Sequence, residues 1–157
     1  MDEPKDHRKA NSSFRRIGAT LNDLLCYFTF VGCWKELSPP EVVKRKRLMD
    51  RIVNVNAPLF SKDFVNKYHE FIGNCYGTYS GWGQDAKLRT LWERRKAAAG
   101  GSWPNAWDGC FTDKGECSDP KVVKSAYVAL MSRFSEELGV GLVSDHVPSG
   151  RIPANIR

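Results

Sequence analysis

The chain has 157 residues, of which 41% are apolar and 27% are charged. This length fits one domain with a substantial core, and this composition excludes a chain that is disordered throughout. The formal net charge is +6 and the isoelectric point is about 9.1. A basic balance favours an acidic macromolecule as partner, either a protein or an anionic surface, with nucleic acid as the alternative.

The first twelve residues are polar and charged, with neither apolar periodicity nor the apolar core of a signal peptide. We expect residues 1–12 to be a disordered lead-in to a helical domain over residues 13–139. The chain has five cysteines, an odd number, which favours free thiols in a reducing, cytoplasmic compartment. A membrane-associated protein is the alternative if an N-terminal anchor is missing from this sequence.

Apolar residues spaced three and four apart predict a first helix from Ser13. This helix becomes apolar on nearly all sides between Leu24 and Trp34, which favours a buried central helix. The apolar run is shorter than the about 20 residues that span a bilayer. Insertion of this helix into a membrane surface is the alternative, because basic residues flank the run.

A second helix is predicted from Ser38, where a capping serine, two prolines and Glu41 follow one another, to about Asn56. One of its faces is apolar and the other is basic. The basic residues considered as a partner-binding surface are Lys44, Arg45, Arg47 and Arg51. Such a face can contact phosphates or an acidic protein, or it can be a solvated surface with no partner.

A capping serine at Ser61 and a wide apolar stripe predict a third helix that extends toward Tyr79. Glycines then break the pattern, and we expect a tight turn between helices that is pinned by the indole of Trp82. Trp82 is also a candidate partner contact. A small ligand beneath the Gly77–Gly83 turn is a further alternative, for which the polar groups would come from Asp85, Lys87 and Arg89.

The remaining chain predicts two more helices. The fourth covers Gln84–Ala99, and the helix macrodipole is a sufficient reason for the basic residues near its end. Residues 102–117 form a loop that Trp103, Trp107 and Phe111 pin onto the helices. The segment Ser118-Asp119-Pro120 opens a fifth helix, which ends at Gly139. Residues 140–157 are rich in Gly, Pro and Ser, and we expect a flexible tail.

No cysteine or histidine pattern predicts a metal or a catalytic centre. Cys26 and Cys33 lie on one predicted helix, two turns or about 10 Å apart, which favours separate core thiols over a shared zinc. Cys110 and Cys117 could form a disulfide in an oxidising compartment. His69 precedes a glutamate but lacks the second histidine of the metalloprotease motif H-E-x-x-H.

The sequence therefore predicts an all-α, single-domain bundle of about five helices with a Trp-rich loop before the last one. The favoured function is non-enzymatic association with an acidic macromolecule through the basic helix face, without a metal or a cofactor. Two alternatives stay open. One is a membrane-proximal helical module, and the other is a small-ligand-binding protein or enzyme that uses the Gly77–Gly83 region.

Overall fold

The computed structural model describes residues 5–77 and 85–139. In this part of the chain it has five α-helices, joined by short 3-10 helices and by one pair of two-residue strands. The prediction of an all-α domain of about five helices is confirmed. Four of the helices are long, and each has the apolar stripe that a bundle requires.

The first two helices are antiparallel neighbours. Helix α1 covers Lys5–Thr29, so it begins before Ser13, and the disordered lead-in predicted over residues 1–12 is corrected from Lys5 onward. Half of the residues from Lys5 to Ser12 are lysine, arginine or alanine, which are strong helix formers. Helix α2 covers Pro39–Val55. Its predicted start is confirmed, because the Ser38 side chain and Glu41 form a reciprocal capping box.

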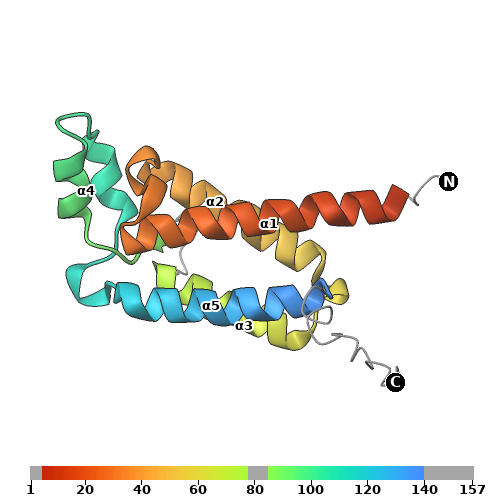
Figure 1. Cartoon of the computed structure of the whole chain (residues 1–157). Coiled ribbons are helices and arrows are strands. Elements are labelled where there is room, and N and C mark those ends of the chain that lie inside the picture. Colours follow the sequence, from red (N-terminus) through yellow and green to blue (C-terminus); the bar gives the residue numbers. More distant parts are fainter. Residues whose placement is uncertain (1–4, 78–84, 140–157) are drawn as a thin grey trace, which may run out of the picture.

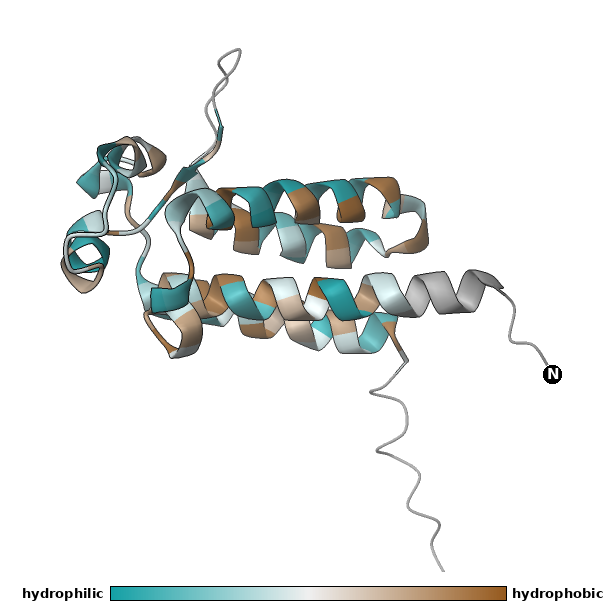
Figure 2. Ribbon diagram, turned by 90° about the horizontal axis from the view of Figure 1, so that it is seen from above, coloured by the Kyte–Doolittle hydropathy of each residue, from teal (hydrophilic) through white to brown (hydrophobic). Residues whose placement is uncertain are grey.

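The second pair of long helices is α3 (Lys62–Cys75) and α5 (Pro120–Glu137). The expected caps are confirmed, because Ser61 accepts a hydrogen bond from the backbone N–H of Phe64 and Asp119 accepts one from Lys121. Helix α5 ends as expected before Gly139, which has a φ of 68°. Figure 1 shows α1 and α2 in one layer and α3 and α5 in the other, and Figure 2 shows the same four helices from above.

The apolar faces of the four long helices meet in one core (Figure 2). At the α5 C-terminal end of the bundle, the Phe134 ring lies 6.0 Å from that of Phe14 and 5.8 Å from that of Phe64. Gly73 of α3 takes no part in this core. It is exposed, and a Cβ atom added there would have no neighbour within 4 Å.

The segment between α3 and α4 differs from the prediction. The third helix ends at Cys75, and Tyr76–Gly77 forms strand β1, which pairs antiparallel with strand β2, Lys87–Leu88. The predicted helix over Gln84–Ala99 is therefore shorter: α4 covers only Trp92–Ala98. The Leu88 carbonyl accepts a hydrogen bond from the Thr112 N–H at 3.0 Å, so this carbonyl has a partner without forming a helix. Two-residue strands are too short for an alternating pattern to reveal.

Helix α4 and the following 3-10 helices, Asn105–Cys110 and Lys114–Glu116, cover one end of the bundle (Figure 1). The predicted loop is attached by its aromatics. Phe111 is buried, and its ring is stacked 5.9 Å from that of Trp103. Trp103 also lies 5.1 Å from Trp107 in an edge-to-face pair. This end is where α1 turns into the 3-10 helix Gly32–Glu36 and where α2 begins. The tail over residues 140–157 lies outside the described residues.

Candidate functional site

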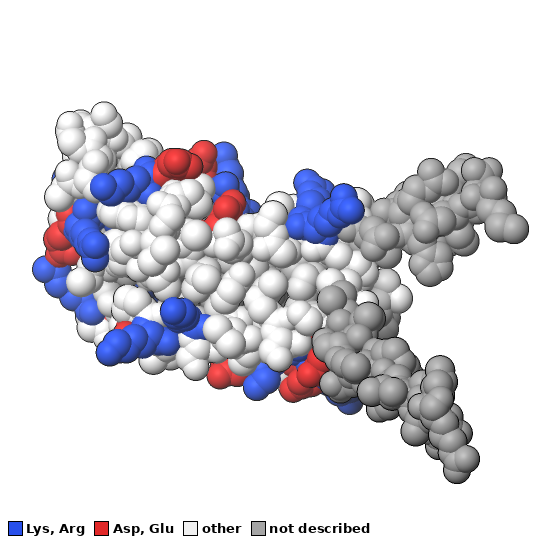
Figure 3. Space-filling view, in the orientation of Figure 1, with Lys and Arg blue, Asp and Glu red and all other residues white. Residues whose placement is uncertain are grey.

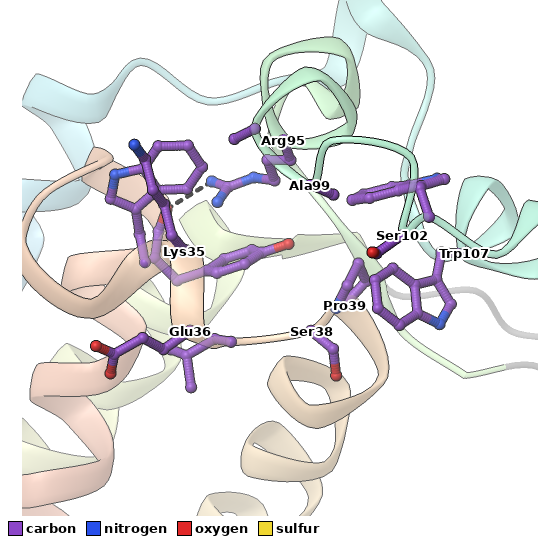
Figure 4. Close-up of a pocket in the computed structure, with 13 residues that line it drawn as sticks. Lys35, Glu36, Ser38, Pro39, Arg95, Ala99, Ser102 and Trp107 are labelled. Atoms are coloured by element: carbon purple, nitrogen blue, oxygen red, sulfur yellow. Dashed lines mark hydrogen bonds between the residues drawn. The ribbon is translucent and has the colours of Figure 1, made fainter.

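A cavity of about 350 Å³ lies at the α4 end of the bundle. Its walls come from four segments that are distant in sequence: the end of α1, the 3-10 helix Gly32–Glu36 with the start of α2, α4, and the Trp-rich loop. Figure 4 shows Arg95 and Lys35 toward one side of the cavity and Ser102 and Trp107 toward the other. The volume lies in the range of about 300–1,000 Å³ that is typical of small-molecule sites.

Arg95 is the charged group of this cavity. Its side chain projects from α4, and only 4% of the residue is exposed. One terminal nitrogen, Nη2, donates to the Tyr27 carbonyl at 2.5 Å and to the Thr90 hydroxyl at 3.0 Å. The other terminal nitrogen, Nη1, and Nε are buried without a hydrogen-bond partner among the described residues. No carboxylate in that part of the chain lies within ion-pair distance of Arg95, and Glu36 turns its carboxylate away from it (Figure 4).

Aromatic rings surround the Arg95 guanidinium. Its central carbon lies 3.5 Å from the centroid of the Tyr27 ring, 4.2 Å from that of Phe30 and 5.6 Å from that of Trp34. Each such cation–π contact stabilises the cation by about 0.5–2 kcal/mol, depending on how far it is removed from water. The rings therefore offset part of the cost of burying the charge, but they accept no directed hydrogen bond from Nε or Nη1.

The pKa of Arg95 also shows that the cost of burying its charge is not fully offset. The pKa of Arg95 is lowered to about 10, mainly by burial; Tyr27 opposes this shift, and the neighbouring Arg94 contributes to it. Arg95 is thus still a cation at neutral pH, although a destabilised one. The Tyr27 hydroxyl is buried and also lacks a hydrogen-bond partner among the described residues. An anion placed here would restore much of the interaction that the guanidinium lost on leaving water.

The opposite wall is mainly aromatic. Trp103 and Trp107 are half-buried and line the cavity beside Ser102. The Trp103 indole N–H donates to an Asp108 carboxylate oxygen at 2.7 Å, which fixes the ring. On the Arg95 side of the cavity, the Lys35 ammonium lies 5.5 Å from the centroid of the Trp34 ring. The cavity therefore combines flat apolar surfaces with cationic groups, an arrangement that suits a ligand with an acidic end and an apolar body.

Two of the four residues of the basic face predicted on α2 form ion pairs within the chain. Arg45 pairs with Asp23 at 3.2 Å, and Arg47 pairs with Asp85 through two hydrogen bonds, one of which is 2.8 Å long. Lys44 and Arg51 are exposed and make no ion pair with another described residue. On the face drawn in Figure 3, lysine and arginine are interspersed with acidic residues and do not form one continuous patch.

The residues predicted to bind a ligand near the Gly77–Gly83 turn include two, Asp85 and Lys87, that lie beside the basic residues of α2. Asp85 holds Arg47, and Arg89 donates to the Gly73 carbonyl at 2.9 Å. A groove of about 390 Å³ joins the two predicted sets, because it is lined by Lys44, Arg47, Asp85 and Lys87. Trp82 and most of the Gly77–Gly83 turn lie outside the described residues, so the structure does not place them.

The cysteines and His69 form no catalytic pair in the described part of the chain. His69 is exposed on α3 and Cys75 is buried. The prediction that Cys26 and Cys33 lie two turns apart on one helix is wrong, because α1 ends at Thr29 and the chain turns back. Cys33 lies in the 3-10 helix Gly32–Glu36, and Gly32 packs against the Cys26 sulfur. Over residues 5–77 and 85–139, no group of three or more His, Cys, Asp and Glu residues is arranged to hold a metal ion.

Sequence reasoning missed Arg95. It had assigned the basic end of α4 to the helix macrodipole, which explains the exposed Arg94 but not its buried neighbour. A signal was present in the spacing. Arg95 follows Leu91 by four residues and Trp92 by three, so it lies on the apolar face of its own helix. A basic residue in that position indicates a buried charge.

Comparison with known proteins adds no assignment: no protein family, curated protein or solved structure matches this chain. Within the described residues, every helix is too short or too polar to cross a bilayer.

Proposed function

We propose that the protein is a non-enzymatic binding module, and that the Arg95 cavity receives an anionic group of its partner. The supporting observation is the Arg95 guanidinium, which is buried with two unpartnered nitrogens and without an acidic residue beside it. A buried charge of this kind is strongly destabilising unless a counter-charge is supplied. Because no described residue supplies one, the partner is the natural source.

The walls indicate what else the ligand carries. A carboxylate or phosphate would face Arg95, while an aromatic or aliphatic body would lie against Trp103 and Trp107. Binding is favoured over catalysis because the cavity lining contains no histidine, cysteine or aspartate, and its one carboxylate, that of Glu36, turns away from Arg95. A free metabolite and an acidic side chain or chain end of a macromolecule share this chemistry.

The α2 face is the second candidate for contact with an acidic macromolecule. The observation in its favour is that Lys44 and Arg51 remain exposed without an ion pair to another described residue. Exposed cations contribute a salt-sensitive attraction to an acidic surface. Lys44 also lines the groove that is lined by Asp85 and Lys87. A partner bound in this groove would therefore contact residues of the predicted α2 face and residues of the predicted ligand site.

Calorimetric titration with four small probes tests the cavity: benzoate, phenyl phosphate, inorganic phosphate and neutral benzyl alcohol. We expect the two aromatic anions to bind, the inorganic anion to bind more weakly, and the alcohol not to bind. Ser102→Trp fills the mouth from an exposed position and leaves Arg95 in place. This variant should weaken binding at least tenfold, equivalent to about 1.4 kcal/mol. Folded Arg95→Gln protein should also bind the aromatic anions at least tenfold more weakly.

The matched control is the double variant Lys44→Glu with Arg51→Glu, which changes exposed charges remote from the cavity lining. It should leave probe binding within about twofold at moderate salt, where screening limits long-range effects. Binding of the alcohol as tightly as of benzoate, or unchanged binding by folded Ser102→Trp, would contradict the cavity proposal. Loss of binding in the double variant alone would transfer the proposal to the α2 face.

A further inference from the structure

The end of α1 is a turn that places two cysteines together. The helix ends at Thr29, and Phe30 and Gly32 then adopt left-handed conformations with φ values of 57° and 60°. The Val31 N–H donates to the Cys26 carbonyl at 3.1 Å, which closes the turn. A Cβ atom added at Gly32 would lie only 3.2 Å from the Cys26 sulfur. The returning chain is therefore packed directly against that sulfur, and Cys33 follows immediately.

The two thiols lie on the same side of this turn and are accessible. The Cys33 thiol donates to an Asp23 carboxylate oxygen at 3.9 Å, and Asp23 lies one helical turn before Cys26 on the same face of α1. Both cysteines are partly exposed, whereas Cys75 is fully buried. A small oxidant can therefore reach either sulfur without unfolding the bundle, and a second thiol on the same side of the turn is positioned to close a disulfide.

The cysteines are also attached to the cavity wall. Tyr27 follows Cys26 and Trp34 follows Cys33 in sequence, and both of these aromatic residues line the cavity and lie against the Arg95 guanidinium. Phe30, at the centre of the turn, lies 5.2 Å from Trp34 and 4.2 Å from Arg95, measured from its ring centroid. A covalent bond across the turn would therefore fix one side of the cavity.

We propose that Cys26 and Cys33 form a reversible disulfide that holds Tyr27 and Trp34 against Arg95 and so tightens binding in the cavity. The oxidant is a low-molecular-weight disulfide. The thiolate of one cysteine attacks a sulfur of this reagent and releases one thiol, which leaves a mixed disulfide on the protein. The second cysteine, deprotonated, attacks the protein sulfur of that mixed disulfide and releases the second thiol. The reagent gains two electrons, and the two protein protons end on the released thiols.

Burial first, and then the charges of Cys26 and Asp23, raise the pKa of Cys33. Cys33 therefore reacts through a minor thiolate fraction at neutral pH. The effect on binding rests on the proposed function of the cavity, whereas formation of the bridge does not.

Equilibration of the protein in mixtures of reduced and oxidised glutathione tests the bridge. Free thiols are then blocked with an alkylating reagent and the peptides are mapped by mass spectrometry. We expect Cys26 and Cys33 to become protected together, with a mass loss of two hydrogen atoms, and to be released by dithiothreitol. Cys33→Ser should abolish the bridge, while the control Cys110→Ser with Cys117→Ser should retain it. A bridge between Cys110 and Cys117 instead, or no bridge with full alkylation of Cys26, would overturn the proposal.

Titration of the oxidised and the reduced protein with phenyl phosphate tests the coupling. The bridged protein should bind about threefold more tightly or better, because a wall that is already ordered loses less freedom on binding. Equal affinity of the two forms, with the bridge mapped, would overturn the coupling. The two proposals fail separately: a bridge that forms in a protein that binds none of the acidic probes refutes the proposed function and leaves the disulfide site in place.

Discussion

At the scale of single residues, the cavity depends on groups whose chemistry is set by their neighbours. Arg94 and Arg95 are adjacent on α4, but Arg94 is exposed while Arg95 is only 4% exposed. The same side chain is therefore a solvated charge in one position and a buried donor in the next. Phe30 adopts a left-handed backbone conformation with a φ of 57°, which is uncommon for a bulky residue. Its contacts with Arg94, Arg95 and Trp34 help to hold it there.

Two glycines provide a residue-scale test of the turn. Gly32 has a φ of 60°, and its added Cβ would meet the Cys26 sulfur at 3.2 Å. Gly32→Ala should therefore lower the free energy of unfolding by about 1–2 kcal/mol, the cost of a left-handed alanine. Gly73→Ala is the matched change, because Gly73 is in α3 with no neighbour within 4 Å of its added Cβ. It should raise the free energy of unfolding by about 0.5–1 kcal/mol. Urea denaturation measures both, and a Gly32→Ala protein as stable as the wild type would contradict the strain argument.

At the scale of elements, local chemistry determined the starts of α2, α3 and α5, but not the start of α1, the end of α3 or the start of α4. Ser38, Ser61 and Asp119 are caps that the sequence displays directly, and the helices begin beside them. The segment around Leu88 has a helical pattern, yet it forms a strand because Thr112 and Cys75 satisfy its backbone. These hydrogen-bond partners are distant in sequence, so the spacing of apolar residues around Leu88 cannot predict them. The Arg95 cavity was missed for the same reason, since its walls come from four separate segments.

The stability that the capping box gives to α2 depends on pH. A Glu41 carboxylate oxygen accepts from the Ser38 N–H at 2.7 Å and from the Ser38 hydroxyl at 2.9 Å. The Ser38 N–H first, and its hydroxyl second, lower the pKa of Glu41 below the ordinary 4.5. The folded pKa is depressed, so this contribution is complete above the ordinary glutamate value and is lost as pH falls through the folded value.

Ser38→Ala should therefore lower the free energy of unfolding by about 1 kcal/mol at pH 7, and by less at a pH below the folded pKa of Glu41, where wild-type Glu41 is protonated. Urea denaturation at both pH values measures the difference. Ser125→Ala, an exposed change within α5, is the control and should be neutral or slightly stabilising at both. An effect of Ser38→Ala that is equal at the two pH values would exclude the carboxylate from the cap.

At the scale of the whole molecule, the two ends of the bundle differ in the groups that they contain. The far end is an aromatic cluster of Phe14, Phe60, Phe64 and Phe134, in which every ring lies within 6.0 Å of another. Arg133 supports it by reaching from α5 to Ser61 and Asp63 at the start of α3. The near end carries the buried cation, the cavity and the two thiols. We expect the first end to determine stability and the second to determine binding.

Two aromatic truncations separate these tasks. Phe134 is 5% exposed, and Phe134→Ala should lower the free energy of unfolding by about 3–5 kcal/mol, because it leaves a cavity among rings that cannot collapse fully. Trp107 is half-buried at the cavity mouth, so Trp107→Ala should remove only about 1 kcal/mol while weakening phenyl phosphate binding severalfold. Urea denaturation and calorimetric titration of the same two proteins give both quantities. If folded Phe134→Ala lost affinity as strongly as Trp107→Ala, the two ends would be one cooperative unit, and the cavity could not be treated as a site mounted on an independent bundle.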